Sequence, residues 1–331
     1  MKAIRVHEIG RPETLRLEDV PEPRPGPGKV LIRVAVAGLN YADTNIRRGR
    51  YVMQPALPYI PGFEVSGTVE ALGEGVDEGR FPLGCRVAAL TLGGGGYAEL
   101  AVAKAAHTIP LPDGLSLEQG AAFPLQGLTA YHVLTTMGRL APGETVVVQA
   151  AAGGVGSMAL QLAKLLGAGR VIAIAGGPEK LRLALKLGAD DAIDYLRENF
   201  PARVNEISEG RGADLILESV GGQTLERSFE CLAVLGRVIT FGNAAGVQAD
   251  LNSVWTRLRS KSQALIGFHL GAALERPELR EASIAALLDY LNDGRLRIAI
   301  GQRFDLAEAG LAQAALEERR SIGKVLLRVS G

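Results

Sequence analysis

A glycine-rich turn between an apolar strand and a helix constrains the fold of this chain more than any other feature. Residues 145–149 form a continuous apolar, largely β-branched run, and the turn at 150–157 follows with glycines at 153, 154 and 156. Such a run is typical of a strand that is buried on both faces of a parallel sheet. The apolar residues after the turn have helical spacing. Strand, glycine turn and helix in this order predict a dinucleotide-binding unit.

Each glycine of this turn has a chemical reason to be there. Gly153 and Gly154 let the backbone come close to a pyrophosphate, and Gly156 lets the helix pack tightly on the strand. The exposed N–H groups and the positive dipole end of the helix attract phosphate charge. We therefore expect a bound dinucleotide. The alternative is a purely structural turn in another α/β fold.

The end of the next strand favours NADPH over NADH. An NAD site usually places Asp or Glu there to bind the ribose hydroxyls. Here the strand at 170–175 ends at Gly176, and no acidic residue is present. Gly176 leaves room for a 2′-phosphate, and Lys180 lies just beyond it to neutralise the charge. The alternatives are that Lys180 is a solvated helix residue, and that Glu179 faces inward and repels a phosphate.

The pattern along the chain predicts an α/β protein with three segments. Residues 1–120 are rich in short strands and glycine turns, which is typical of a compact barrel or sandwich. Residues 121–265 alternate strands with helices, including a short helix at 228–235, and predict a parallel sheet. Residues 266–331 contain a helix at 277–291 and then a last strand, which we expect to return to the first domain.

Composition excludes several classes of function. The chain has 331 residues, enough for about two domains, and 36 basic residues balance 36 acidic ones. A net charge of zero gives no long-range attraction to nucleic acid or to an acidic membrane. Two distant cysteines without a CxxC spacing exclude a disulfide framework. Without a signal-like N-terminus or a long apolar stretch, we expect a cytoplasmic protein with no membrane partner.

Six short motifs occur in a fixed order over nearly the whole chain. They are 38–43 with Arg47, Gly49 and Tyr51; 61–67; 124–130; 150–156; 187–190; and Gly323-Lys324. With them the chain resembles the quinone oxidoreductase (zeta-crystallin-like) branch of the medium-chain dehydrogenase/reductases, which lack zinc. The resemblance implies a GroES-like, β-rich catalytic domain at 1–120 and a doubly wound, six-stranded Rossmann domain at 121–265.

The resemblance also implies roles for single residues. Asn40 and Tyr51 would be the catalytic residues that face the substrate. The residues that it places at the cofactor, together with those already named, are Thr129, Gly153, Gly154, Val155, Gly156, Gly176, Lys180, Tyr195, Phe241, Asn243, Arg319 and Lys324. One departure matters: where members of this branch often carry a second tyrosine, this chain has Asn45. Alternative roles are packing for the two tyrosines, a solvated helix face for Arg319 and a turn for Asn40.

The residues argue against a catalytic metal. Zinc relatives place a cysteine near position 39 or 40 and a histidine at 63, where this chain has Leu39, Asn40 and Phe63. Without a Lewis acid, hydride transfer to an electron-poor acceptor is the chemistry that remains accessible. We therefore expect NADPH-dependent reduction of a small-molecule quinone or α,β-unsaturated carbonyl. The alternatives are an enoyl-thioester reductase of the same fold and a dinucleotide-binding structural or RNA-binding protein.

Residues 263–268 form an apolar run that we expect at the edge of the sheet. An exposed edge strand invites pairing with another chain. Relatives in this branch dimerise through this strand, so the resemblance implies a homodimer.

Overall fold

The chain forms two compact units. The structure, a computed structural model, describes residues 1–329. Unit 1 comprises Met1–Leu125 together with the segment that begins at Ile298, and unit 2 comprises Gln126–Arg297. The first boundary lies close to the expected 120, but the chain returns to unit 1 at 298 and not at 266. The reason is packing: Leu287 contacts Gly127, and Gln161 bonds the backbone of Arg297, so the segment before 298 stays with unit 2.

Unit 2 contains a six-stranded sheet in which all strands are parallel. Its order is β10-β9-β8-β11-β12-β13. The strands are β8 (Thr145–Val148), β9 (Arg170–Ala175), β10 (Asp191–Asp194), β11 (Ala213–Glu218), β12 (Leu232–Thr240) and β13 (Ala264–Gly267). The order reverses between β8 and β11, which is the switch point where doubly wound sheets bind their ligands. The expected Rossmann architecture is confirmed, and β13 is indeed an edge strand.

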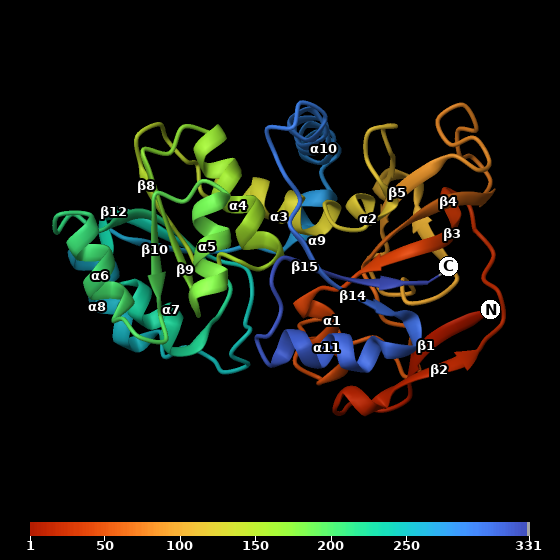
Figure 1. Cartoon of the computed structure of the whole chain (residues 1–331), viewed down its shortest axis with the longest axis horizontal. Helices are drawn as coiled ribbons and strands as arrows, with labels where there is room; N and C mark the ends of the chain where they lie inside the picture. The colour runs from red at the N-terminus through yellow and green to blue at the C-terminus, as the bar shows by residue number, and fades with distance from the viewer. Residues whose placement is uncertain (330–331) are drawn as a thin grey trace. The chain divides into compact units, whose positions relative to one another are not determined.

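Helices cover both faces of this sheet (Figure 1). The helices of unit 2 are α3 (Pro124–Leu134), α4 (Gly154–Leu165), α5 (Pro178–Lys186), α6 (Phe200–Ile207), α7 (Gly222–Ser228), α8 (Asn252–Ser260), α9 (Leu270–Leu274) and α10 (Pro277–Asn292). Helices α6, α7 and α8 share one apolar cluster with the sheet, and α4 and α5 lie on the opposite face. The expected helix at 228–235 is wrong. The helix ends at Ser228, because Leu232 already pairs with Ala213 as the start of β12.

Unit 1 is built on a seven-stranded sheet with the order β14-β15-β3-β4-β5-β7, and β6 pairs with β3. Its strands are β1 (Lys2–Val6), β2 (Leu15–Asp19), β3 (Lys29–Gly38), β4 (Glu64–Leu72), β5 (Arg86–Leu90), β6 (Leu100–Lys104), β7 (Thr108–Pro110), β14 (Ile300–Asp305) and β15 (Lys324–Arg328). Its helices are α1 (Tyr41–Arg47), α2 (Leu117–Gly120) and α11 (Ala309–Glu317). Strand β15 pairs antiparallel with β3, which confirms that the end of the chain returns to the first domain.

One buried cation fastens the end of α1 inside unit 1. The Arg47 side chain is fully buried, and its Nε donates to Gln313 Oε1 of α11 at 2.7 Å. Its guanidinium also pairs with Glu317 of the same helix. The position of α1 matters because Asn40, at its N-cap, is one of the two expected catalytic residues. Within residues 1–329, no helix combines the length and apolar character that crossing a bilayer requires.

Candidate active site

The turn from β8 into α4 leaves little room for a side chain at two positions. A Cβ on Gly156 would lie 2.4 Å from the carbonyl oxygen of Ala150 and 2.7 Å from Cα of Ala151, both backbone atoms. A Cβ on Gly154 would lie 2.2 Å from Gln126 Oε1. Ala150 itself has a φ of +49°, which costs free energy for a residue with a Cβ. The turn is thus tightly built, and it sits beside the switch point.

The turn leaves backbone donors for an anion. Gly153 is the N-cap of α4, and no side chain caps the helix there. The first N–H groups of a helix have no carbonyl partner within the helix. Val155 is half-buried in the same first turn. These amides and the helix dipole make the turn a fitting cradle for a pyrophosphate.

The end of β9 carries two glycines, with Tyr195 and Lys180 nearby. Gly176 and Gly177 follow the strand, and a Cβ on Gly176 would lie 3.1 Å from the ring of Tyr195. The structure therefore brings Tyr195 against Gly176, although the residues are far apart in sequence. Lys180 is half-buried in the first turn of α5, whereas Glu179 is exposed. Glu179 thus turns toward solvent, as a phosphate pocket beside Lys180 requires.

Asp194 is a carboxylate near this pocket that sequence reasoning missed. It lies at the end of β10 and is buried. Its Oδ1 accepts hydrogen bonds from the backbone N–H groups of Gly177 and Leu196, each at 3.1 Å. The carboxylate therefore holds the turn after β9 in place. The signal in the sequence is an acidic residue at the last position of a strand that neighbours β9.

A second missed carboxylate, Glu218, organises the loops after β11 and β12. Its side chain is fully buried, and Oε1 accepts from the N–H groups of Val220 at 2.7 Å and Gly221 at 2.8 Å. Burial raises the pKa of Glu218, and these hydrogen bonds oppose the rise. Its backbone oxygen accepts from Phe241 N at 3.0 Å. Glu218 thus ties the loop after β11 to the segment that carries Phe241 and Asn243.

Asn243 carries a buried oxygen that suits a ligand. A Cβ on Gly221 would lie 2.4 Å from Asn243 Oδ1, so the two loops are in close contact. This Oδ1 has no hydrogen-bond partner among the described residues. A buried acceptor without a donor is costly, and a hydroxyl-bearing ligand would satisfy it. Thr129, on α3, is also buried. The parts of unit 2 that could hold a dinucleotide are therefore the turn before α4, the end of β9 and the loop after β12.

In unit 1, Asn40 belongs to a buried polar cluster with Lys324 and Glu64. Lys324 is 2% exposed, and its Nζ donates to Asn40 Oδ1 at 2.7 Å and to Glu64 Oε2 at 2.5 Å. The other oxygen of Glu64 accepts from Leu125 N at 2.7 Å. Asn40 Nδ2 donates to Gly38 O at 3.1 Å. The structure thus brings together two residues, Asn40 and Lys324, that the sequence assigned separately.

Asp43 lies on the other side of Asn40. It accepts from Asn40 N at 2.9 Å, Tyr97 Oη at 3.0 Å and Gly62 N at 3.1 Å. Burial nevertheless raises the pKa of Asp43 to about 6, because desolvation outweighs these hydrogen bonds. Burial, and then the charge of Asp43, raise the pKa of the Tyr51 hydroxyl. Tyr51 therefore stays protonated at neutral pH and can act as a donor.

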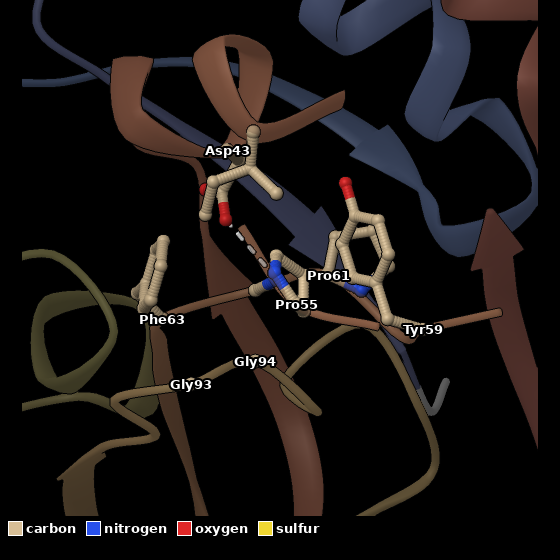
Figure 2. A pocket seen from close by; sticks show the side chains of 9 residues that line it. Asp43, Pro55, Tyr59, Pro61, Phe63, Gly93 and Gly94 are labelled. Atoms are coloured by element: carbon tan, nitrogen blue, oxygen red, sulfur yellow. Dashed lines mark hydrogen bonds between the residues drawn. The ribbon is translucent and has the colours of Figure 1, made fainter. Parts of the chain in front are cut away.

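A small pocket beside Asp43 is lined by Tyr59 and Phe63 (Figure 2). Figure 2 shows these two rings flanking Pro55 and Pro61, with Asp43 above them in that view. The pocket measures about 10 Å³, the space that one water molecule needs. It is too small for a quinone ring. Phe63 is buried and its ring lies near that of Tyr51, with the ring centroids 6.2 Å apart and the ring planes tilted by 42°.

The remaining expected residues lie elsewhere in unit 1. Arg319 is exposed just after α11, with a φ of +57°, and is therefore past the helix and not on its face. Asn45, at the position of the expected second tyrosine, is buried within α1. At the positions of the zinc ligands, Leu39 and Phe63 are buried hydrophobic residues. Within residues 1–329, no three His, Cys, Asp or Glu side chains form a group that could hold a metal ion.

Two family models match the chain, one in each unit. The model described as an alcohol dehydrogenase GroES-like domain matches residues 26–113. The model described as a zinc-binding dehydrogenase matches residues 154–288. These matches assign the β-rich sheet of unit 1 and the parallel sheet of unit 2 to the two halves of the dehydrogenase architecture.

Full-length relatives carry a more specific name. A quinone oxidoreductase of Pseudomonas aeruginosa is 40% identical over 326 residues, which is 98% of this chain and 99% of that protein. A mycobacterial protein solved with NADPH is 36% identical, with a TM-score of 0.93 and coverage of 99% of this chain and 100% of that one. The Thermus thermophilus quinone oxidoreductase, also solved with NADPH, is 40% identical with a TM-score of 0.85 over 99% and 100% of the two chains. The chain therefore belongs to the quinone oxidoreductase branch of the medium-chain dehydrogenase/reductases.

Proposed function

We propose that this chain is an NADPH-dependent oxidoreductase that reduces a quinone or an α,β-unsaturated carbonyl compound without zinc. The observation that carries the proposal is the glycine turn at the switch point of unit 2. Its backbone donors fit a pyrophosphate, and a Cβ at Gly156 would collide with backbone atoms of Ala150 and Ala151. Two similar proteins were solved with NADPH, which supports the same cofactor here.

The end of β9 selects the phosphorylated cofactor. Gly176 carries no carboxylate that would repel a 2′-phosphate, and the nearby Asp194 is engaged by two backbone amides. Lys180 supplies the positive charge, and the Tyr195 hydroxyl supplies a further donor. A hydrogen bond to a charged group contributes roughly 1.5–3 kcal/mol. This free energy is sufficient to set a preference for NADPH over NADH.

The substrate is an electron-poor acceptor. When bound, NADPH supplies a hydride from its reduced nicotinamide. The acceptor takes the hydride and one proton, so a quinone becomes a hydroquinone and an enone becomes a saturated carbonyl. Asn40 and Tyr51 donate hydrogen bonds to the acceptor oxygen, on which negative charge develops. The Tyr51 hydroxyl is suited to this role because burial keeps it protonated.

The reaction does not depend on zinc because the ligand positions carry side chains that cannot coordinate a metal. Leu39 and Phe63 are buried and apolar, and Asn40 Oδ1 already accepts a hydrogen bond from the Lys324 ammonium group. Zinc-dependent relatives need three protein ligands with an open fourth position. A quinone or an enone is already polarised at the carbon that accepts hydride, so the protein needs only to position it and to donate hydrogen bonds.

Stopped-flow measurement of NADPH oxidation tests this function. A panel of quinones, enones, aldehydes and alcohols is offered, each with and without EDTA. We expect turnover of quinones or enones that EDTA leaves unchanged. Activity confined to alcohols and dependent on added zinc would refute the proposal.

The cofactor preference is tested by Lys180→Ala with a matched control on the same helix. Lys186→Ala removes an exposed lysine from the last turn of α5. We expect Lys180→Ala to weaken NADPH binding about 10- to 100-fold and NADH binding little, because only NADPH carries the 2′-phosphate. Lys186→Ala should change neither. Equal losses for both cofactors in Lys180→Ala would remove the argument from the 2′-phosphate.

The same proposal includes a homodimer that forms through β13. This strand pairs only with β12 among the described strands, so its outer edge offers unpaired backbone groups. Its side chains are half-buried, apart from exposed Gly267. Light scattering at micromolar concentration should give twice the mass of the chain, and a monomeric mass would contradict this part of the proposal.

A further inference from the structure

The buried cluster of Asn40, Lys324 and Glu64 has a feature that the proposed reaction does not use. Lys324 comes from β15, whereas Asn40 follows β3 and Glu64 begins β4. These three strands are neighbours, and Leu326 lies opposite Gly38 in the register. The pairing of these strands therefore places the ammonium group of Lys324 beside the side-chain amide of Asn40. The remaining question is what an almost fully buried lysine does there.

Gly38 makes this approach possible. A Cβ on Gly38 would lie 2.8 Å from both Glu64 Oε2 and Lys324 Cε, and 2.1 Å from the carbonyl oxygen of Ala121. Any larger residue would push the lysine and the glutamate apart. The same Gly38 offers its carbonyl oxygen to Asn40 Nδ2 at 3.1 Å. Gly38 thus leaves space for Lys324 and Glu64 and also supplies the backbone acceptor for Asn40.

The hydrogen bonds of Asn40 determine the orientation of its side-chain amide, with the oxygen toward Lys324 and the nitrogen at the other end. The Lys324 ammonium can only donate, so the atom that receives its bond at 2.7 Å must be the oxygen Oδ1. Nδ2 is then the remaining end, and among the described residues it makes one hydrogen bond, to Gly38 O. The second hydrogen is left for an acceptor. Asn40 is buried, with 8% of its surface exposed, and the proposed function supplies the acceptor as a substrate oxygen.

We infer that Lys324 is a positioning residue, held by Glu64, that orients the Asn40 amide so that its N–H group faces the substrate oxygen. The inference rests on the proposed function, because it specifies how Asn40 donates. Glu64 neutralises the ammonium and fixes its place, since its second oxygen is held by Leu125 N. Without Lys324, the amide can rotate and present its oxygen, which repels the negative charge that develops on the acceptor.

This role differs from direct cofactor binding, which the sequence suggested for Lys324. A residue that contacts the cofactor changes the Kd for NADPH. A residue that orients Asn40 changes kcat, and it does so only when Asn40 is present. The two roles are therefore separable by a double-mutant cycle.

The test uses the double variant Glu64→Gln with Lys324→Met in the full chain. Removing both charges avoids an unpaired buried ion, which would threaten folding. We expect kcat to fall about tenfold, as for a displaced catalytic group, and the Kd for NADPH to stay within about twofold. Asn40→Ala should lower kcat by about 100-fold as an oxyanion donor is lost. Adding Asn40→Ala to the double variant should give no further loss beyond Asn40→Ala alone.

Two controls keep the test informative. Arg303→Met with Glu118→Gln removes a more exposed ion pair of unit 1, in which Arg303 Nε and Glu118 Oε1 are 2.7 Å apart, and should leave kcat unchanged. Lys324→Arg keeps a positive donor beside Glu64 and covers the case in which the double variant fails to fold. We expect it to retain kcat within a few fold and to bind NADPH normally.

The contrary outcomes are distinct. If adding Glu64→Gln and Lys324→Met to Asn40→Ala lowered kcat by a further tenfold, Lys324 would act independently of Asn40. That result would overturn the inference. If the double variant or Lys324→Arg bound NADPH more weakly but kept its kcat, Lys324 would be a cofactor-binding residue and the inference would fail. Full kcat in Asn40→Ala would refute the catalytic role of Asn40 in the proposed function, and the inference with it.

Discussion

The two units bury charge in different ways. In unit 1 the buried charged side chains are Asp43, Arg47, Glu64 and Lys324, and both cations pair with carboxylates. In unit 2 they are Asp194 and Glu218, and backbone amides hold both. Unit 1 therefore pairs its buried cations with carboxylates from distant parts of the chain, whereas the buried carboxylates of unit 2 accept hydrogen bonds from nearby backbone amides. The difference predicts unequal losses of stability when a buried glutamate is replaced by glutamine in each unit.

The largest expected effect comes from one substitution made in both units. Glu64→Gln leaves the buried Lys324 ammonium without its counter-ion, and breaking such a pair costs about 3–5 kcal/mol of stability. Glu218→Gln keeps its amide bonds, because both go to one oxygen that glutamine retains. It should cost about 1 kcal/mol or less. Urea denaturation of the two variants measures the contrast, and equal losses would break the comparison.

A smaller effect is expected at the glycine turn of unit 2. Gly156→Ala places a Cβ against backbone atoms of Ala150 and Ala151 at 2.4–2.7 Å. Overpacking of this kind costs about 1–3 kcal/mol, and the displaced helix should also weaken NADPH binding. Gly114→Ala is the matched control, because a Cβ there meets nothing within 4 Å. Thermal unfolding and fluorescence titration with NADPH give the two readouts. A normal Kd in Gly156→Ala would show that the turn does not need its tight packing.

The pH dependence of unit 1 sharpens the comparison further. Burial raises the pKa of Asp43 to about 6, so the folded chain binds a proton there between about pH 4 and 6 that the unfolded chain does not. Asp43 therefore contributes stability at low pH that is lost as the pH rises through about 6. The stability of the parent chain minus that of Asp43→Asn should fall from pH 4 to pH 7. A rise would mean that the three hydrogen bonds outweigh desolvation.

The smallest expected effect is the opposite response of His132 in unit 2. Burial lowers its pKa, and its Nε2 is buried with no hydrogen-bond partner among the described residues. The neutral ring thus contributes stability above about pH 6.5, which is lost as the pH falls through the lowered pKa. His132→Phe keeps a ring beside Phe268 and does not titrate. Its Tm should fall less than that of the parent chain on acidification, and parallel curves would contradict this.

The predictions from sequence succeeded where the signal is local. The strand at 170–175 was predicted with its exact ends, because a β-branched run between two glycines marks it. The helix at 228–235 was wrong, because Leu232 belongs to a strand only through its partner Ala213. The domain return was placed at 266 and lies at 298, because the segment between them is held by contacts with Gly127 and Gln161.

The candidate site shows the same division. Gly153, Gly154 and Gly156 could be named from the sequence because one turn carries them all, and their role at a phosphate stays a prediction. Asp194 and Glu218 were missed because their function is to bind backbone amides of other loops, which no short motif displays. The contact of Lys324 with Asn40 spans 284 positions. Nothing in either motif indicates the other.

The sequence by itself therefore determined the alternation of elements, the glycine turn and the absence of zinc-ligand side chains at positions 39 and 63, since each depends on residues close together in the chain. The tertiary structure alone decided which strands became neighbours and so which charges met. The physical reason is that a buried charge is tolerated only beside a partner, and the sheet register brings that partner from a remote part of the chain.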